Sequence, residues 1–345
     1  MTVAAGREGA SLRVASRLHV LRAGKRAQFL SLGARVAKEK VTKGMPARLG
    51  LALPLIAALF VAGCGGLGAS NGSLCPAPTL EPVTMPGGSG ASVTYGFLID
   101  RAYTGDAKRS PSYPWPQLPM TALNTVAGAL ASLDLRPGDS VFGTWISHNS
   151  NDMREIFLPL SQVPKSSAAE YPAAPVAPKA PINQLECNDY SAKVRAYNTA
   201  AKEWQTKVND IAQAAAAQDA QTVATFIDRT QSAIRGASPV QDPVGTDIYG
   251  GLAVAGGVFG ANPGKHKLVL FSDMTDTIGN PVRPDLAQSD VVVGLYHRDD
   301  PSDQGKGQLD WANTFKTLNA RTPVFLPWAA TTADKIVEQL KATGR

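Results

Sequence analysis

Lys267–Asp276 reads KLVLFSDMTD, an apolar run that is followed closely by two acids. Such a run, bounded by polar residues, is typical of a strand that is buried on both faces of a parallel sheet. Ser92–Asp100 (SVTYGFLID) and Asp290–Tyr296 (DVVVGLY) have the same character. We therefore expect three buried strands, two of which end next to an aspartate, Asp100 and Asp273.

The stretches between these strands have helical patterns, in which apolar residues recur at spacings of three and four. Strands that alternate with helices predict an α/β fold with a doubly wound, mostly parallel sheet that helices cover. A further short strand is expected at Thr322–Leu326. The expected helices are Pro119–Leu133, one that begins near Thr246 or Asp247, Leu309–Asn319 and Thr332–Lys341.

Two further strand-like runs, Ser140–Ser147 and Arg154–Leu158, flank a short polar turn and predict an antiparallel hairpin at the sheet edge. Residues 159–186 are rich in Pro and Ala, and we interpret them as an extended insertion on the surface. Asp189–Arg235 predicts one long helix or two, with an apolar stripe that faces the core. The stripe consists of Val194, Tyr197, Ala201, Trp204, Val208 and Ile211.

The net positive charge of the chain comes from its first 63 residues, which hold 11 Lys or Arg against two acids. The remainder has a net charge of −3, so it lacks the clustered positive face that nucleic-acid binding requires. Leu49–Ala62 is an apolar run interrupted by Pro54. This run is too short to span a bilayer as a helix and is typical of a signal peptide.

Val61–Cys64 reads VAGC and resembles the lipobox of bacterial lipoproteins. The resemblance implies that Cys64 is acylated, as by palmitate, and becomes the new N-terminus, with an ordinary cleavage site as the alternative. The protein is then anchored to a bacterial cell membrane or envelope and faces outside the cytoplasm. Residues 45–63 suffice as the signal peptide, so residues 1–44 are either surplus, which we favour, or a basic amphipathic extension.

Residues 64–91 are rich in Gly, Ser and Pro and predict a flexible tether ahead of one domain, residues 92–345. With Cys64 lipidated, Cys75 and Cys187 remain as a candidate disulfide pair in an oxidising compartment. No spacing of Cys or His typical of a zinc site occurs.

Oxygen-bearing side chains are expected at one edge of the sheet. Doubly wound sheets bind ligands at the carboxyl ends of their strands, where Asp100 and Asp273 lie. Thr246 lies in a loop before a helix and is expected at the same edge. Carboxylates and a hydroxyl suit a hard cation such as Mg²⁺, although each residue also has a structural interpretation as a helix cap or turn residue.

Three segments, FLIDRAYT (Phe97–Thr104), PVGTDIYGGL (Pro243–Leu252) and LVLFSDMTD (Leu268–Asp276), resemble the metal-site loops of von Willebrand factor A-type (vWA) domains in order and strand context. The resemblance implies a site for adhesion to another protein, with Mg²⁺ or Mn²⁺ held by Asp100, Thr104, Thr246 and Asp273. Ala102 departs from the family, because it has no oxygen where the family has a hydroxyl ligand. The metal site is therefore degenerate: weakened, completed by water, or lost.

We expect a non-enzymatic, lipid-anchored protein that binds an unidentified envelope protein at this edge. One alternative is a metal-free vWA-like scaffold with the same anchor. Another is a phosphatase similar to the haloacid dehalogenases, with Asp100 as nucleophile, but Ala102 cannot act as the general acid that this family places there. No Gly-x-Ser-x-Gly, Walker or His-Glu-x-x-His motif indicates an enzyme.

Overall fold

The computed structural model describes residues 79–87, 90–101, 117–239, 244–279, 282–297 and 301–344. All of them belong to one unit, Ala69–Arg345. The predictions for the leader, for the lipidation of Cys64, and for Cys75, Ala102 and Thr104 lie outside the described residues.

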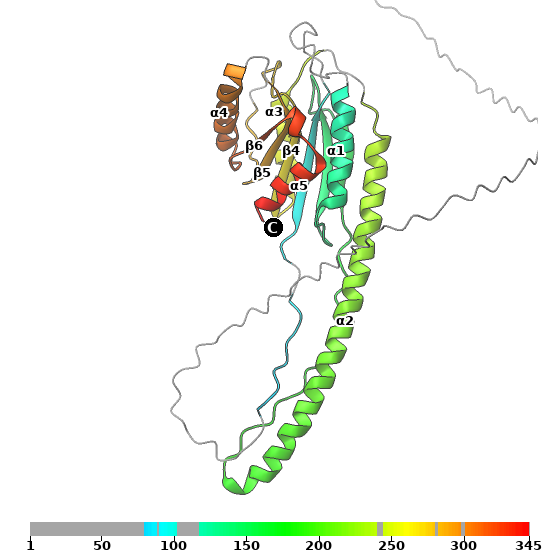
Figure 1. Ribbon diagram of the computed structural model, residues 1–345, viewed down its shortest axis with the longest axis vertical. Helices are drawn as coiled ribbons and strands as arrows, with labels where there is room; N and C mark the ends of the chain where they lie inside the picture. The colour runs from blue at the N-terminus through cyan, green and yellow to red at the C-terminus, as the bar shows by residue number, and fades with distance from the viewer. Residues whose placement is uncertain are drawn as a thin grey trace, which may run out of the picture. The chain divides into compact units, whose positions relative to one another are not determined.

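The described domain is built on a six-stranded sheet with the order β3-β2-β1-β4-β5-β6 (Figure 1). All neighbouring strands are parallel except β2 and β3, which are antiparallel. The predicted doubly wound, mostly parallel sheet with an antiparallel edge hairpin is therefore confirmed. The strands are β1 Val93–Asp100, β2 Ser140–Ile146, β3 Ile156–Gln162, β4 Lys265–Phe271, β5 Asp290–Tyr296 and β6 Val324–Pro327.

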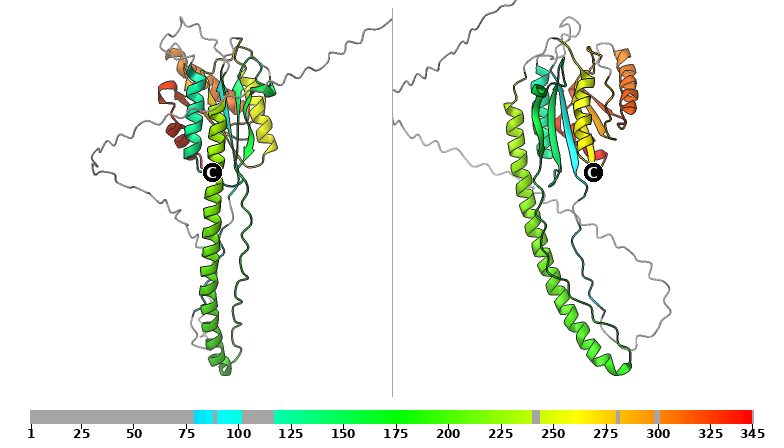
Figure 2. Two further views of the ribbon diagram at one scale, coloured as in Figure 1. Left: turned by 90° about the vertical axis from the view of Figure 1, so that its right-hand side faces the viewer. Right: turned by 180° about the vertical axis from the view of Figure 1, so that it is seen from behind.

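Helices cover both faces of the sheet (Figures 1 and 2). One core lies between the sheet and α1, α5 and the C-terminal part of α2, and the other lies between the sheet and α3 and α4. The α-helices are α1 Leu118–Ser132, α2 Cys187–Gly236, α3 Ile248–Ala261, α4 Pro301–Thr317 and α5 Ala333–Ala342. The short 3-10 helices are η2 Met153–Glu155, η3 Gln184–Glu186 and η4 Trp328–Ala330.

The central strand β1 contributes side chains to both cores, because successive residues of a strand point to opposite faces. Phe97 and Ile99 lie in the core with α1, whereas Leu98 lies in the core with α3. Gly96 is required by packing: a Cβ atom at this position would lie 2.6 Å from Cζ of Phe142. The near-continuous apolar character of the strand follows from burial on both faces.

The edge strand β3 is longer than the sequence indicates. It continues to Gln162, which pairs with Ser140, so Pro159–Gln162 belong to the sheet and not to the Pro/Ala-rich insertion. Pro159 is tolerated because β3 is the end strand, where a missing backbone N–H disrupts no second neighbour. The segment without regular structure between β3 and η3 is thus confined to residues 163–183.

Helix α2 is one continuous helix of 50 residues, about 75 Å long at the usual rise of 1.5 Å per residue. Its C-terminal part packs on the domain through Phe226 and Ile234, and Gln231 Nε2 donates to the carbonyl of Ala127. Its N-terminal half is accompanied by two stretches of extended chain, residues 79–87 and 163–181 (Figure 2). We call these two stretches the extended segments.

The first extended segment, residues 79–87, is bonded to α2 by amide side chains. Asn198 Oδ1 accepts from the backbone N of Glu81 (2.9 Å), and its Nδ2 donates to the carbonyl of Thr79 (2.9 Å). Gln205 binds Thr84 in the same two-sided way, at 3.1 Å and 3.2 Å. Residues 79–87, expected as part of a flexible tether, are therefore held against the helix.

The second extended segment, residues 163–181, runs along α2 in the opposite direction. Ser166 Oγ donates to Asp219 Oδ2 (2.8 Å), and Trp204 Nε1 donates to the carbonyl of Pro172 (2.8 Å). Trp204 and the neighbouring stripe residues Val194, Ala201 and Val208 are buried but belong to neither core of the domain. Four of the six predicted stripe residues are therefore buried, as expected, but outside the two clusters that pack on the sheet.

The remaining helix boundaries agree with the sequence, with one exception. Helix α4 begins at Pro301, eight residues ahead of the expected Leu309, since proline is favoured in the first turn of a helix. Within the described ranges, no helix combines the length and the apolar character needed to cross a bilayer.

Candidate functional site

The first and third predicted loops meet at the carboxyl ends of two adjacent strands. Asp100 is the last residue of β1, and Ser272 and Asp273 directly follow β4, which pairs in parallel with β1. Ser272 Oγ donates a hydrogen bond to Asp100 Oδ2 (2.8 Å). We call this region, Asp100–Arg101, residues 244–250 and residues 272–279, the carboxyl edge.

The second predicted loop is bonded to the third. Thr246 is buried, and its backbone N donates to Thr277 Oγ1 (2.9 Å). Its carbonyl accepts from the backbone N of Thr277 (3.0 Å) and of Ile278 (3.3 Å). All three predicted loops therefore contribute described residues, Asp100, Thr246 and Asp273, to this one edge.

Asp247 joins the second loop both to strand β2 and to the start of α3. Its backbone N donates to the carbonyl of Ser147 (2.8 Å), and its carbonyl accepts from Ser150 Oγ (2.7 Å). Its Oδ1 accepts from the backbone N of Gly250 (2.8 Å), so Asp247 is the N-cap of α3. Gly250 is required here, because a Cβ atom would lie 2.2 Å from Asp247 Oδ2.

The third loop is fixed by residues that sequence reasoning did not assign to the site. Met274 has a φ of 64°, its side chain is buried in the core with α3, and its backbone N donates to Ser272 Oγ (2.9 Å). Its carbonyl accepts from Trp311 Nε1 on α4 (2.9 Å). Ser272 was visible beside Asp273 in the motif, whereas nothing in the sequence marks Trp311, 37 residues away from Met274.

The carboxyl edge is acidic. Asp273 Oδ1 accepts from the backbone N of Thr275 (2.8 Å). Burial raises the pKa of the Asp276 carboxyl, the backbone N–H groups of Gly279 and Ile278 lower it, and the nearby negative charge of Asp247 raises it further. Asp276 Oδ2 is buried and has no hydrogen-bond partner among the residues that the structure describes. Arg101, at the same edge, pairs with another acid, since its Nη2 lies 2.5 Å from Glu155 Oε1.

Cys187 begins α2 and is disulfide-bonded. The other two cysteines of the chain, Cys64 and Cys75, both lie outside the described residues. The pairing of Cys187 with Cys75 stays a prediction.

The described residues do not complete a metal site. Among the residues that the structure describes, no three His, Cys, Asp or Glu side chains gather closely enough to hold an ion. Asp100 Oδ2 and Asp273 Oδ1 already accept hydrogen bonds from Ser272 and Thr275, and Ala102 supplies no side-chain oxygen. Thr104 lies outside the described residues. The binding of Mg²⁺ or Mn²⁺ by Asp100, Thr104, Thr246 and Asp273 therefore stays a prediction.

The solved structures to which this chain is similar include two proteins with low overall similarity. A von Willebrand factor type A protein from Catenulispora acidiphila has a TM-score of 0.34 at 15% identity, covering 74% of this chain and 43% of that chain. The pilus adhesin SpaC from Lactobacillus rhamnosus GG, in its open conformation, has a TM-score of 0.31 at 9% identity, covering 75% and 31%. This chain therefore spans less than half of either protein.

No family model matches the sequence, and no curated protein matches it. The assignment of a vWA-like α/β fold rests on the strand order, the antiparallel edge strand and the meeting of the three loops at the carboxyl edge.

Proposed function

We propose that the chain is a lipid-anchored protein of the bacterial cell envelope that binds a partner protein at the carboxyl edge without catalysing a reaction. The hydrogen bond between Ser272 and Asp100 carries this proposal, because it joins the first and third loops into one surface. The second loop is fixed to the same surface through Thr246 and Thr277. A surface built from three separately anchored loops is preorganised, which lowers the entropy cost of binding.

The proposed partner supplies positive charge. Asp100, Asp273 and Asp276 lie on the carboxyl edge, and the neighbouring Arg101 is engaged by Glu155. Lysine or arginine side chains of a partner can therefore bind the half-buried carboxylates of Asp100 and Asp273 directly, with no bridging metal ion, and the charge of Asp276 adds to the acidic potential. This form of the proposal keeps the binding edge that the vWA resemblance implies and omits the cation.

The anchor is proposed from the lipobox. Acylation of Cys64 would place the chain in the membrane fraction, and Cys64→Ser should release it to the soluble fraction. The disulfide at Cys187 supports an oxidising compartment, since disulfides persist there and are rare in the cytosol.

Site-specific photo-crosslinking in intact cells tests the binding surface. A photo-reactive side chain at Ile278, exposed on the carboxyl edge, should give one discrete cross-linked protein. The matched position is Asp134, which is exposed and precedes β2 at the opposite edge of the sheet, and should give none. Asp273→Ala should reduce the product from Ile278, whereas equal products at Ile278 and Asp134 would refute a specific surface.

The same cross-linking experiment in the presence of a chelator distinguishes metal-free from cation-dependent binding. We expect the cross-link from Ile278 to persist in EDTA. Loss in EDTA with recovery in Mg²⁺ would replace the metal-free form by a cation-dependent one of the kind that the vWA resemblance implies. Turnover of phosphoesters that is abolished by Asp100→Asn would instead establish the phosphatase alternative.

A further inference from the structure

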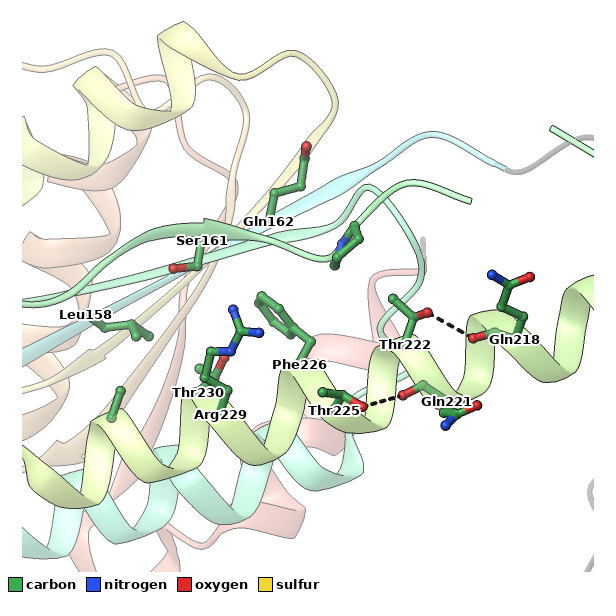
Figure 3. A pocket seen from close by; sticks show the side chains of 12 residues that line it. Leu158, Ser161, Gln162, Gln218, Gln221, Thr222, Thr225, Phe226, Arg229 and Thr230 are labelled. Carbon is green, nitrogen blue, oxygen red and sulfur yellow. Dashed lines mark hydrogen bonds between the residues drawn. The ribbon is translucent and has the colours of Figure 1, made fainter. Parts of the chain in front are cut away.

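A pocket with a volume of 470 Å³ lies between the edge strand β3 and helix α2 (Figure 3). Phe226 and Leu158 form its apolar floor and are buried, whereas Gln218, Gln221 and Arg229 on α2 lie at its exposed rim. Ser161, Gln162 and Pro164 form the opposite wall. Gln162 pairs with Ser140 at the start of β2, so this pocket lies at the opposite end of the sheet from the carboxyl edge.

Helix α2 already binds extended polypeptide elsewhere along its length. The side-chain amides of Asn198 and Gln205 each make two hydrogen bonds to residues 79–87. Each amide accepts one from a backbone N–H and donates one to a backbone carbonyl. Lys202, between them, pairs with the carboxylate of Glu81 (3.2 Å). The segment it binds contains Pro82 and Pro86, and the other extended segment, which Trp204 contacts, is also rich in proline.

The periodicities of the two chains explain this recognition. The paired residues are seven apart on the helix, Asn198 and Gln205, and three apart on the extended segment, Glu81 and Thr84. Seven helical residues rise about 10.5 Å. Three residues of extended, polyproline-like chain rise about 9–10 Å and complete one turn. Amides spaced by two helical turns therefore meet the same side of an extended, proline-containing segment.

The pocket presents side chains of the same kinds, two amides and one cation, at a different spacing. Gln218 and Gln221 are three residues apart on the helix, and Arg229 lies eight residues after Gln221; these three side chains line the pocket together with Thr222 and Thr225. Within the part of the chain that the structure describes, the side chains of Gln218, Gln221 and Arg229 make no hydrogen bond, whereas both threonines bond their own helix. Among the described residues that line the pocket, Arg229 is the only charged one.

We propose that this pocket binds an extended, proline-containing segment of a partner protein that carries an acidic side chain. The amides of Gln218 and Gln221 pair with its peptide groups by the same kind of hydrogen bonds as Asn198 and Gln205 make to residues 79–87, but from positions about one helical turn apart. Arg229 binds its acidic side chain, as Lys202 binds Glu81, and the apolar floor around Phe226 receives proline rings. The outer edge of β3, which pairs with no further strand among the described residues, adds backbone groups along the same wall.

An array of nine-residue peptides tests the proposal with the full chain in detergent micelles. The peptides carry proline at every third position, with or without one glutamate, beside Gly/Ser peptides of equal length. We expect the proline peptides with glutamate to bind. The affinity of the tightest-binding peptide is then measured by fluorescence anisotropy. Gln218→Ala combined with Gln221→Ala should weaken this peptide about tenfold, because two hydrogen bonds are lost. Arg229→Ala should remove the preference for glutamate.

The matched control is Gln213→Ala, a glutamine on the exposed surface of the same helix outside the pocket, which should leave affinity unchanged. All four positions are exposed, so the fold is retained in each variant. Absence of binding, equal binding of Gly/Ser peptides, or equal affinity of the double variant would overturn the proposal.

Discussion

Buried carboxylates at single positions hold the ends of strands in place. Asp139 is buried, its Oδ1 accepts from the backbone N of Val93, the first residue of β1, and its Oδ2 accepts from that of Arg136. One side chain therefore ties the start of the central strand to the turn that precedes β2. The sequence shows Asp139 only as a turn residue after Pro137 and Gly138, because its long-range partner is 46 residues away.

Asp139→Ala should destabilise the domain by about 3 kcal/mol, because two backbone N–H groups lose their acceptor and one of them is buried. Urea denaturation followed by circular dichroism measures the change. Asp134→Ala is the control: its side chain is largely exposed and pairs with Arg136 at the surface, so we expect less than about 0.5 kcal/mol. Equal effects of the two substitutions would contradict the role of Asp139.

Asp276 and Asp285 should have opposite effects on the pH dependence of stability. Burial raises the pKa of Asp276, so its stabilising contribution is complete below the ordinary value of 3.8 and is lost as the pH rises through the raised pKa. The backbone N–H of Ala287 and the side chain of Asn319 lower the pKa of Asp285. Its contribution is therefore present above 3.8 and is lost as the pH falls through the lowered pKa.

Asn substitutions measure these two contributions by denaturation between pH 3 and pH 7. Asp276→Asn should become more stable relative to the natural chain as the pH rises, because Asn keeps the acceptor for Ile278 and Gly279 without the buried charge. Asp285→Asn should become less stable relative to it over the same range. Parallel curves for both variants would show that neither carboxyl group has a shifted pKa.

At the scale of elements, strands were predicted more accurately than the packing of α2. The apolar runs of β1, β4 and β5 are unambiguous, because a strand buried on both faces must be apolar throughout. The stripe on α2 has the same periodicity whether it packs on a sheet or beneath extended chain, so the pattern could not identify its partner. The two segments that lie against this part of α2, residues 79–87 and 163–181, have no periodic pattern that would predict their position.

The pairing of residues 79–87 with α2 depends on two amide side chains. Asn198→Ala combined with Gln205→Ala should raise the hydrogen-exchange rates of the Glu81 and Thr84 amides at least about fivefold, because each loses a hydrogen bond. Exchange of β1 should stay unchanged. Lys207→Ala, on the exposed surface of the same part of the helix, should change neither rate. Unchanged exchange in the double variant would refute the pairing.

On the scale of the whole molecule, the order of strands and loops could be predicted, and with it the convergence of Asp100, Thr246 and Asp273 on one edge. The bonds that fix this edge could not be predicted, because Ser272, Ser147 and Trp311 form them with residues distant in sequence. The sequence also gives no sign of the pocket beside Phe226, since its two walls, β3 and α2, meet only in the folded chain.

The N-terminal half of α2 should open without unfolding of the domain. Its buried apolar residues Val194, Trp204 and Val208 belong to neither of the two large cores. Native-state hydrogen exchange in increasing urea should therefore give residues 190–210 a lower opening free energy than β1 and β4. A common opening free energy for all these amides would show that the helix and the domain unfold as one cooperative unit.

The path of the chain through β1 has a mechanical consequence. A pull on residues ahead of Thr79 first loads the bonds of Asn198 and Gln205 and then passes into β1, which lies between β2 and β4. Force along a strand with parallel neighbours on both sides shears all its ladder hydrogen bonds together, instead of unzipping them one at a time. β1 ends at Asp100. A force applied between the residues ahead of Thr79 and a partner bound to Asp100 would therefore act along this single strand.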